Sequence, residues 1–335
     1  MIPVFYEARV SSDMLMAFQQ RCCRMQYFPE TDTGLEIHDI NRAVELAFGD
    51  HGRGIVQMPP KIYVTLPKGD FRTMPAYLPS LGLAGVKVVN VHPDNPACGL
   101  PTVMALTILL DVATGLPIAI LNATRLTDLR TGAAGAVAAK YLAPKKEVTL
   151  GLIGTGRQAT AQLDAISREL TVNSVRIWSR NEDHAKVFAE KISGFDAEVT
   201  SAKKACDVDI IVTTTPSRSP IIQNEWVHEG THINAIGADA PGKEELEPAL
   251  LRRAQVFVDD PAQAIHSGEI NVPISMGLYR PDEIYGTLGE LVIGRKKREG
   301  RDRITIFDST GLAIQDLAIA GIAMKQGKTI DLPFL

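Results

Sequence analysis

Cysteine is scarce in this chain of 335 residues, which holds four: Cys22, Cys23, Cys98 and Cys206. They form no C-x-x-C spacing, and the adjacent residues Cys22 and Cys23 are poor partners for a mutual disulfide. We therefore expect reduced thiols, which excludes a disulfide scaffold and a thiolate metal site. The histidines suggest no zinc site either, so we expect no metal.

The chain also lacks long apolar runs and a dominant sign of charge. No run approaches the roughly 20 residues of a membrane-spanning helix, and MIPVFYEARVSSDML has no signal-peptide pattern. The net charge of −4 gives no basic field for nucleic acid. With 45% hydrophobic and 22% charged residues, we expect a soluble, cytoplasmic protein that binds neither membrane nor nucleic acid.

The first third of the chain has the pattern of a sheet-rich domain. Residues 38–49 carry the apolar spacing of a helix closed by Gly49. From about 55 to 125, short β-rich runs such as KIYVTL, GVKVVNV and PIAILNA alternate with Pro and Gly. Residues 127–143 then predict an Ala-rich helix that packs through small side chains.

After residue 147, strands and helices alternate. The expected strands are VTLGLIG, SVRIWS, DIIVTTT, HINAIGA, VFVDD and ITIFD. This order predicts an α/β fold with a doubly wound parallel sheet of the Rossmann type over 126–311. GLAIQDLAIAGIAMKQG predicts a final helix that returns to the first domain. The second, α+β domain would then consist of 1–125 and 312–335.

A glycine turn between the first two of these strands predicts a dinucleotide site. Gly154 permits the tight turn, Gly156 lets the backbone approach a pyrophosphate, and Ala159 allows close helix–strand packing. The free N–H groups of the following helix would face the phosphates. The remaining residues expected at this turn are Thr155, Arg157 and Gln158.

The end of the second strand bears on which dinucleotide binds. NAD sites usually carry an acidic residue there for the ribose hydroxyls, whereas this chain has Ser179, Arg180 and Asn181. Because Arg180 can pair with a 2′-phosphate, NADP(H) is slightly favoured over NAD. The alternative is that Arg180 is solvated while Glu182 or Asp183 binds the ribose.

Four charged residues occupy unusual places. Lys87 lies within the apolar strand GVKVVNV; in a closed cleft it could shuttle protons, and otherwise it points to solvent. Asp239 follows the strand HINAIGA, where parallel sheets place ligands, although it could be a turn residue. Arg72 and Arg130 could pair with a carboxylate, or form surface ion pairs.

Hydroxyl side chains complete the set of cofactor candidates. Thr214 and Thr215 follow one strand, and Ser309 follows another. Thr131 comes next to Arg130 at the start of the Ala-rich helix. Each could instead be an ordinary strand-end or helix hydroxyl.

A resemblance to a known family extends from about residue 37 to the last helix. It rests on QMPPKIYV, GDFRTMPAYL, GVKVVNVHPDNP, LRTGAAGAVAAKYLA, GLIGTGRQA, VTTTPSR and ITIFDSTGLAIQD. These segments are similar to the ornithine cyclodeaminase/mu-crystallin family, and most of all to its archaeal-type alanine dehydrogenases. Thr102 in GLPTVMA falls where the cyclodeaminases carry a threonine on the cofactor or substrate side.

The resemblance implies a homodimer, with the α+β domain serving substrate binding and dimerisation. It implies that Lys87 and Asp239 are the catalytic pair and that Arg72 and Arg130 hold a substrate carboxylate. Lys61 is a rival to Arg72, because other members carry an arginine near that position.

The implied activity is NAD(P)-dependent oxidation of a small L-amino acid, with L-alanine as the expected substrate, to its keto acid and ammonia. Three alternatives stay open. A cyclodeaminase would convert ornithine to proline and ammonia, with the cofactor reduced and reoxidised. A ketimine reductase would reduce a cyclic imine such as pyrroline-2-carboxylate. A protein that only binds NADPH would have no need of the charged residues above.

Overall fold

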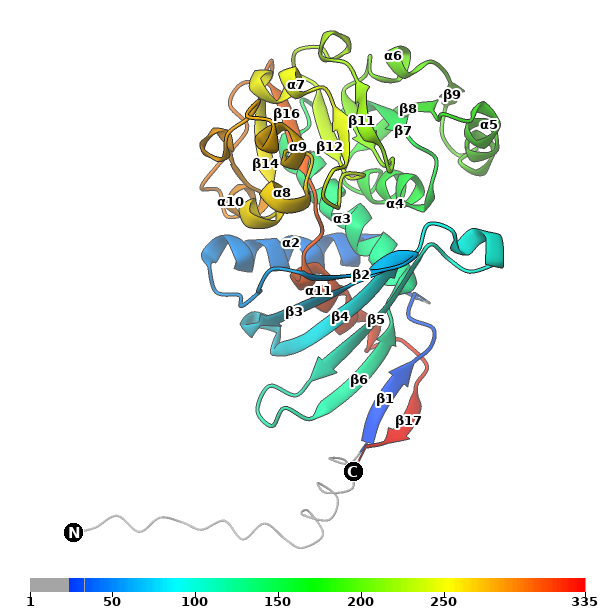
Figure 1. Ribbon diagram of the computed structural model, residues 1–335, viewed down its shortest axis with the longest axis vertical. Coiled ribbons are helices and arrows are strands. Elements are labelled where there is room, and N and C mark those ends of the chain that lie inside the picture. The colour runs from blue at the N-terminus through cyan, green and yellow to red at the C-terminus, as the bar shows by residue number, and fades with distance from the viewer. Residues whose placement is uncertain (1–23, 33, 335) are drawn as a thin grey trace, which may run out of the picture.

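The computed structural model describes residues 24–32 and 34–334, and the chain folds into two lobes, each built on one large sheet (Figure 1). The expected α/β class is confirmed. Cys22, Cys23 and the segment MIPVFYEARVSSDML lie outside the described residues, within which Cys98 and Cys206 are free thiols. No described helix combines the length and apolar character needed to cross a membrane.

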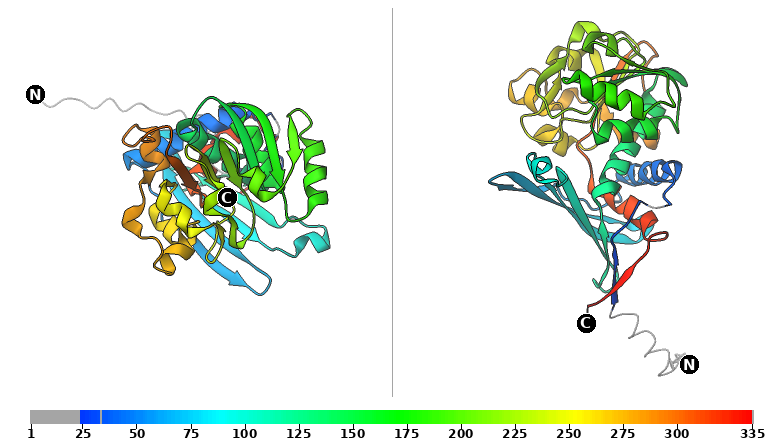
Figure 2. Two further views of the ribbon diagram at one scale, coloured as in Figure 1. Left: turned by 90° about the horizontal axis from the view of Figure 1, so that it is seen from above. Right: turned by 90° about the vertical axis from the view of Figure 1, so that its right-hand side faces the viewer.

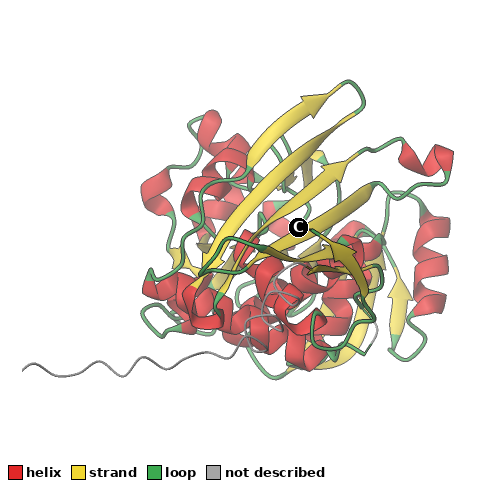
Figure 3. Cartoon of the chain, turned by 90° about the horizontal axis from the view of Figure 1, so that it is seen from below, coloured by secondary structure: helices red, strands yellow, loops and turns green. Residues whose placement is uncertain are grey.

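The first lobe contains a seven-stranded sheet to which both ends of the described chain contribute. Its order is β17 (Ile330–Pro333), β1 (Arg24–Phe28), β6 (Pro117–Asn122), β5 (Val103–Leu110), β4 (Leu83–Val91), β3 (Gly69–Leu78) and β2 (Ile62–Leu66). The strands are antiparallel except for the parallel pair β1–β6. Figure 3 shows the long strands side by side with helices flanking them.

Three helices build the core of this lobe: α2 (Ile37–Arg53), α3 (Thr124–Leu142) and α11 (Ala313–Ala323). α11 crosses β3, β4 and β5, and it packs on α2 and α3. The expected end of the first helix at Gly49 is wrong. α2 continues to Arg53 and ends at Gly54, which has a left-handed φ of 72°.

The second lobe contains an eight-stranded, all-parallel sheet. Its order is β15 (Gly286–Thr287), β14 (Ala254–Val258), β16 (Ile304–Asp308), β12 (His232–Ala235), β10 (Ile210–Thr213), β7 (Glu147–Ile153), β8 (Thr171–Trp178) and β9 (Ala197–Val199). β11 (Arg218–Ile222) and β13 (Glu244–Leu246) form a separate parallel pair. The expected doubly wound parallel sheet is confirmed.

Seven further helices belong to the second lobe. They are α4 (Arg157–Ile166), α5 (Glu182–Lys191), α6 (Ala202–Ala205), α7 (Pro248–Arg253), α8 (Pro261–Ser267), α9 (Asn271–Ser275) and α10 (Leu288–Val292). Single 3₁₀ turns occupy Pro79–Leu81, Asn95–Cys98, Asn224–Trp226 and Pro281–Glu283.

Helix α3 connects the two lobes (Figure 2). It packs against α2, α11 and β5 on one side and against α4 and β12 on the other. Its glycines and alanines permit this: a β-carbon on Gly132 would lie 2.3 Å from the backbone oxygen of Ala161. Because α3 belongs to both cores, the domain boundaries at 125/126 and 311/312 stay a prediction.

Candidate active site

A cavity of about 230 Å³ lies between the two lobes. Both lobes contribute charged side chains to its wall, and these are Lys61, Arg72, Lys87, Asp128, Arg130, Asp239 and Lys243. The structure therefore brings together all five charged residues that the sequence analysis singled out. Their roles in chemistry stay predictions.

The hairpin of β3 and β4 places Arg72 and Lys87 on one face of the sheet. Met74 lies directly opposite Lys87 in the register, and Arg72 lies opposite Val89. Alternate residues of a strand point to opposite faces, so these four side chains share the face that lines the cavity. Lys87 is 1% exposed, which excludes the alternative that it points to solvent.

Lys87 and Arg130 share one carboxylate oxygen beneath the cavity. Lys87 Nζ donates a hydrogen bond to Asp316 Oδ1 at 2.8 Å, and Arg130 Nε donates to the same oxygen at 3.0 Å. Arg130 Nη1 also donates to Gln315 Oε1 at 2.8 Å. Burial lowers the pKa of Lys87 to about 8; the Asp316 carboxylate opposes this fall, and the Arg130 charge adds to it.

Lys61 reaches the cavity from the loop before β2. Its Nζ donates to the backbone oxygen of Thr310 at 2.7 Å. Burial lowers the pKa of Lys61 to about 8, against the attraction of Asp259 and Asp239. Thr310 belongs to the loop after β16, and Asp259 accepts hydrogen bonds from the backbone N–H groups of Thr310 and Gly311 at 2.7 Å each. The backbone oxygen that Lys61 contacts is thereby held by a residue at the end of β14.

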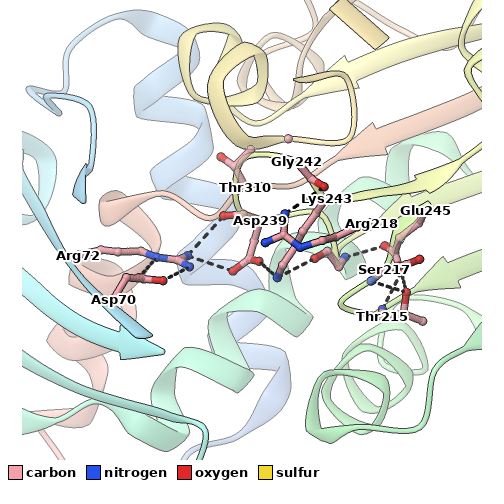
Figure 4. Close-up of polar contacts among 12 residues, drawn as sticks. Asp70, Arg72, Thr215, Ser217, Arg218, Asp239, Gly242, Lys243, Glu245 and Thr310 are labelled. Carbon is pink, nitrogen blue, oxygen red and sulfur yellow. Dashed lines mark hydrogen bonds and ion pairs between the residues drawn. The ribbon is translucent and has the colours of Figure 1, made fainter. Parts of the chain in front are cut away.

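Arg72 and Asp239 meet across the lobes (Figure 4). Arg72 Nη1 lies 3.1 Å from Asp239 Oδ2, while its Nε donates to Asp70 Oδ1 at 2.8 Å. Lys243 Nζ lies 2.5 Å from the other Asp239 oxygen. Burial alone would raise the pKa of Asp239, but the charges of Lys243 and Arg72 hold it well below its usual range. Asp239 is therefore an anion near neutral pH.

A second cavity of about 660 Å³ lies at the carboxyl end of the parallel strands, and it contains the predicted dinucleotide residues. Its wall includes Gly154, Thr155, Gly156, Ser179, Arg180 and Asn181. Thr214 and Thr215 line both cavities, which places the two sites next to each other.

The glycine turn has the geometry that a pyrophosphate site needs. Gly154 has a φ of +110°, which side-chain-bearing residues rarely adopt. Gly156 precedes the first turn of α4, and a β-carbon there would meet no atom within 4 Å, so open space lies beside it. Ala159 is fully buried against the sheet. An anion can therefore approach the N-terminus of α4 closely.

Two residues of the turn contact α3 instead of facing the phosphate side. Arg157 Nε donates to Asp128 Oδ2 at 2.8 Å, and Gln158 Nε2 donates to Asp128 Oδ1 at 3.0 Å. Asp128 precedes Arg130 by two residues on the same helix. α3 thus contacts the dinucleotide turn and also carries Arg130, which together with Lys61 and Lys87 forms the cation cluster of the first cavity.

The three residues after β8 differ in how free their side chains are to bind a ligand in the second cavity. Ser179 is half-buried and Arg180 is exposed, and both line the second cavity. The Asn181 side chain accepts hydrogen bonds from the N–H groups of Asp183 and His184, and so caps α5. Part of its hydrogen-bonding capacity is already used for that structural purpose.

Besides Thr214 and Thr215, two further hydroxyl candidates line the first cavity, and one candidate lines neither cavity. Thr131 and Ser309 are both part of its wall, and Ser309 Oγ is buried without a hydrogen-bond partner in the structure. Thr102 lies before β5 outside the residues that line either cavity, and its backbone oxygen accepts a hydrogen bond from the His92 N–H at 2.8 Å. A role for Thr102 stays a prediction.

Asp128, Lys243 and Asp316 were not predicted from the sequence. Only Asp316 carried a recognisable signal: it follows Gln315 as the second of two polar residues in an otherwise apolar final helix. Asp316 is 3% exposed and Gln315 is fully buried, which is unusual for such side chains unless they are paired.

A metal-motif spacing, His-Glu-Gly-Thr-His, occurs at His228 and His232 and was not recognised in the sequence. The motif binds zinc when both histidines lie on one helix face, whereas His232 here lies on β12. Its ring nitrogens contact Thr305 Oγ1 and Asn234 Oδ1 at 2.9 Å each. His228 is exposed near Asp207, so this segment has the geometry of a loop and a buried strand.

Comparison with known proteins gives consistent matches over nearly the whole chain. The family model described as "Ornithine cyclodeaminase/mu-crystallin family" matches residues 24–326. An alanine dehydrogenase of Archaeoglobus fulgidus is 50% identical over 299 residues, which cover 88% of this chain and 92% of that protein.

Solved structures agree with this match. An archaeal alanine dehydrogenase dimer with bound NAD superposes with a TM-score of 0.88 at 46% identity, covering 92% of this chain and 99% of that one. The Δ1-pyrroline-2-carboxylate reductase of Thermococcus litoralis, in complex with NADH and L-proline, has a TM-score of 0.87 at 34% identity. That match covers 90% of this chain and 97% of the reductase.

Proposed function

Because this chain belongs to the ornithine cyclodeaminase/mu-crystallin family, we propose that it is an NAD(P)-dependent dehydrogenase of a small L-amino acid, with L-alanine as the first choice. The reaction is L-alanine + NAD(P)⁺ + H₂O → pyruvate + NH₄⁺ + NAD(P)H + H⁺. The observation that carries the proposal is the cluster of Lys61, Lys87 and Arg130, which shares a cavity with Asp239 beside the dinucleotide turn.

The residues present fit a nicotinamide dinucleotide. The open space at Gly156 and the N-terminus of α4 suit the pyrophosphate, and Ser179 and Arg180 lie where the adenosine ribose would bind. The unpaired Ser309 Oγ offers a hydrogen bond at the nicotinamide end. When bound, the nicotinamide ring accepts a hydride from the substrate Cα.

We assign the substrate carboxylate to Lys61 and Arg130. Arg72 is balanced by two carboxylates, Asp70 and Asp239. Arg130, by contrast, shares the single Asp316 carboxylate with Lys87, and Lys61 Nζ donates to the neutral backbone oxygen of Thr310. This favours Lys61 over Arg72 as a carboxylate ligand. Arg72 then holds Asp239 in place from the opposite lobe.

Asp239 and Lys87 are suited to move the protons. The Asp239 carboxylate can accept a proton from the water that adds to the imino carbon. Lys87, with a pKa near 8, can give a proton to the departing nitrogen and take it back from solvent. Ammonia then leaves, and the C–O bond formed by the water becomes the ketone of pyruvate.

The cavity does not favour a cyclodeaminase. Ornithine carries a second ammonium, which needs an unpaired carboxylate. Among the described residues that line the cavity, the carboxylates are Asp128 and Asp239. Asp128 is engaged by Arg157 and Gln158, and Asp239 by Arg72 and Lys243.

We also propose a homodimer, as the archaeal relative is described. The face of the seven-stranded sheet opposite Lys87 is apolar and partly exposed, and it includes Val86, Val88, Leu106, Ile108 and Ile120. A second copy would cover this face. Light scattering should give about twice the 36.3 kDa chain mass, and Ile108→Glu should give the monomer mass. A monomeric parent protein would refute the dimer.

The function is tested by absorbance at 340 nm with NAD⁺ or NADP⁺ and L-alanine, L-ornithine or D-alanine in separate reactions. Net NAD(P)H and pyruvate from L-alanine alone would support the proposal. Proline and ammonia from ornithine without net absorbance would establish a cyclodeaminase. Oxidation of NAD(P)H by pyrroline-2-carboxylate, with L-alanine inert, would establish a ketimine reductase. Lys87→Ala is the inactive control, and it should still bind the dinucleotide.

Cytoplasmic location remains the expectation from composition.

A further inference from the structure

Asp316 lies beneath the cation cluster but outside the wall of the cavity. It is in the first turn of α11, near the end of the chain, and is 3% exposed. Its Oδ1 accepts from Lys87 Nζ at 2.8 Å and from Arg130 Nε at 3.0 Å, although these residues belong to different elements, β4 and α3. One oxygen thus joins three segments that are far apart in the sequence.

Arg130 is held in this arrangement from several sides. Gln315 accepts from its Nη1, and the loop before α11 lies against the guanidinium. A β-carbon on Gly311, whose φ is +80°, would come within 2.5 Å of Arg130 Nη1. The direction in which Arg130 points is therefore set by the residues that lead into α11, among which Asp316 supplies the only charge.

The charges beneath the cavity do not cancel. Lys87 and Arg130 contribute two positive charges, and Asp316 contributes one negative charge, so the group keeps a surplus of one. Lys61 adds a further positive charge at the same cavity wall, so a substrate carboxylate would meet net positive charge. Asp316 Oδ2 is buried and has no hydrogen-bond partner in the structure. The contacts of Asp316 with Lys87 and Arg130 are therefore both made by Oδ1.

We propose that Asp316 is a positioning residue that holds the Arg130 guanidinium beside the Lys87 ammonium, so that the substrate carboxylate assigned to Lys61 and Arg130 meets net positive charge. The inference rests on the proposed amino-acid oxidation for its substrate. It adds that the C-terminal helix, through a side chain that touches no substrate, sets the charge and direction of the carboxylate site.

The charged groups around Lys87 agree with this role. The pKa of Lys87 is lowered to about 8, chiefly by burial, and the positive charges of Arg130 on α3 and Lys61 before β2 contribute to this fall. Asp316 on α11 is the one group among these contributors that raises it, by its charge and by its hydrogen bond. Without Asp316, Lys87 would lose its proton at a lower pH.

The test compares the full chain with Asp316→Asn, which keeps the size of the side chain and removes its charge. Pyruvate is titrated into each protein by calorimetry between pH 6 and pH 9.5, in the presence of NADH. We expect the pH at which pyruvate affinity is lost to fall by about one unit in Asp316→Asn, since a neighbouring charge of opposite sign commonly shifts a pKa by this much. The affinity for NADH should stay within about twofold.

Two control variants separate positioning from general damage. Asp50→Asn removes another buried, ion-paired carboxylate of the same lobe, from α2. It should leave unchanged the pH at which pyruvate affinity is lost, which we call the midpoint. Asp316→Glu keeps the charge, so its midpoint should stay near that of the parent protein even if pyruvate binds more weakly. An unchanged midpoint in Asp316→Asn would overturn the proposal.

If Asp316→Asn does not fold, the double variant Lys87→Met/Asp316→Asn tests whether Lys87 and Asp316 form a buried ion pair. Removing both partners of a buried ion pair costs less stability than removing one, so the double variant should fold and melt at a higher temperature than the single one. A double variant no more stable than Asp316→Asn would overturn the pairing.

The outcomes for function and for positioning are distinct. A parent protein that binds pyruvate but does not oxidise alanine would refute the dehydrogenase while leaving the Asp316 comparison intact. A parent protein that binds neither pyruvate nor L-alanine would overturn the carboxylate site itself, and with it both proposals.

Discussion

Arg72 and Asp239 belong to different lobes and are joined by an ion pair of 3.1 Å across the cavity. Arg72 is held by Asp70 on its own strand, and Asp239 by Lys243 four residues further along the chain. The two networks meet in the cavity that we propose for the substrate. Asp239 is thus kept charged by groups that neither lobe supplies alone.

Asp239→Asn should abolish most of the turnover. The amide cannot accept a proton from water, and general-base catalysis typically contributes 10²–10⁴-fold, so we expect kcat to fall by about that factor. The NADH affinity, measured by fluorescence, should change less than about twofold. The control is Asp207→Asn, which removes an exposed carboxylate of the same lobe. Retention of more than about a tenth of kcat would contradict a role for Asp239 as base.

Ser179→Asp should move cofactor preference from NADP⁺ toward NAD⁺. A carboxylate at the end of β8 would repel a 2′-phosphate and accept hydrogen bonds from ribose hydroxyls. The expected change in the ratio of kcat/KM values is about tenfold or more, equivalent to about 1.4 kcal/mol. Asp183→Asn tests the alternative that Asp183 binds the ribose. If that variant shifts the ratio and Ser179→Asp does not, the assignment to Ser179 is wrong.

Acidification should destabilise the fold through His232. The ring is fully buried on β12, and burial lowers its pKa to about 3, from about 6.5 in the unfolded chain. Below pH 6.5 the unfolded chain therefore binds a proton at His232 that the folded chain does not bind. The free energy of unfolding falls as the pH falls toward 3. The slope from one such group is about 1.4 kcal/mol per pH unit at most.

His232→Gln should flatten this dependence, because glutamine does not titrate. Urea unfolding at pH 7.5 and pH 5 should show a smaller loss of unfolding free energy in the variant than in the parent protein, whatever their stabilities at pH 7.5. Equal losses would mean that His232 is not the responsible group.

Gly132→Val should destabilise the junction of α3 and α4. The new β-carbon would lie 2.3 Å from the Ala161 backbone oxygen, so one helix must move. Overpacking of this kind costs about 1–3 kcal/mol, measurable by urea denaturation. Gly194→Ala, where a β-carbon meets nothing within 4 Å, should change the unfolding free energy by less than about 0.5 kcal/mol. A stable Gly132→Val variant would show that α3 and α4 can separate at little cost.

Local patterns predicted the architecture and the dinucleotide turn, because alternation of strand and helix and the spacing of Gly154 and Gly156 are recorded in neighbouring residues. They did not predict the end of α2 at Arg53, since Gly49 was interpreted as a helix stop. In the structure Gly52 lies against Gly289 of α10, where a β-carbon would come within 2.3 Å of its backbone oxygen. The close approach explains the glycine, and only the tertiary fold reveals it.

The site residues also divide into those that local sequence predicts and those that only tertiary contacts reveal. Lys87 was recognisable as a lysine among valines, and Asp239 as an acid at a strand end. Asp316 was not recognisable as their partner, because it lies 229 residues from Lys87 and 186 from Arg130. No periodicity or motif spacing reports a contact of that separation.

The contribution of both chain ends to one lobe affects how the protein is made. α11 lies in the same core as β1, α2 and the strands of the seven-stranded sheet, and β17 pairs with β1. On the ribosome, the parallel sheet emerges complete before α11 does, so the dinucleotide-binding half can fold first. The half that carries Lys61 and Lys87 must wait with an open core until the last segment is synthesised. Premature termination shortly before residue 313 would thus release a chain with a finished nucleotide fold and an unfinished, aggregation-prone sheet.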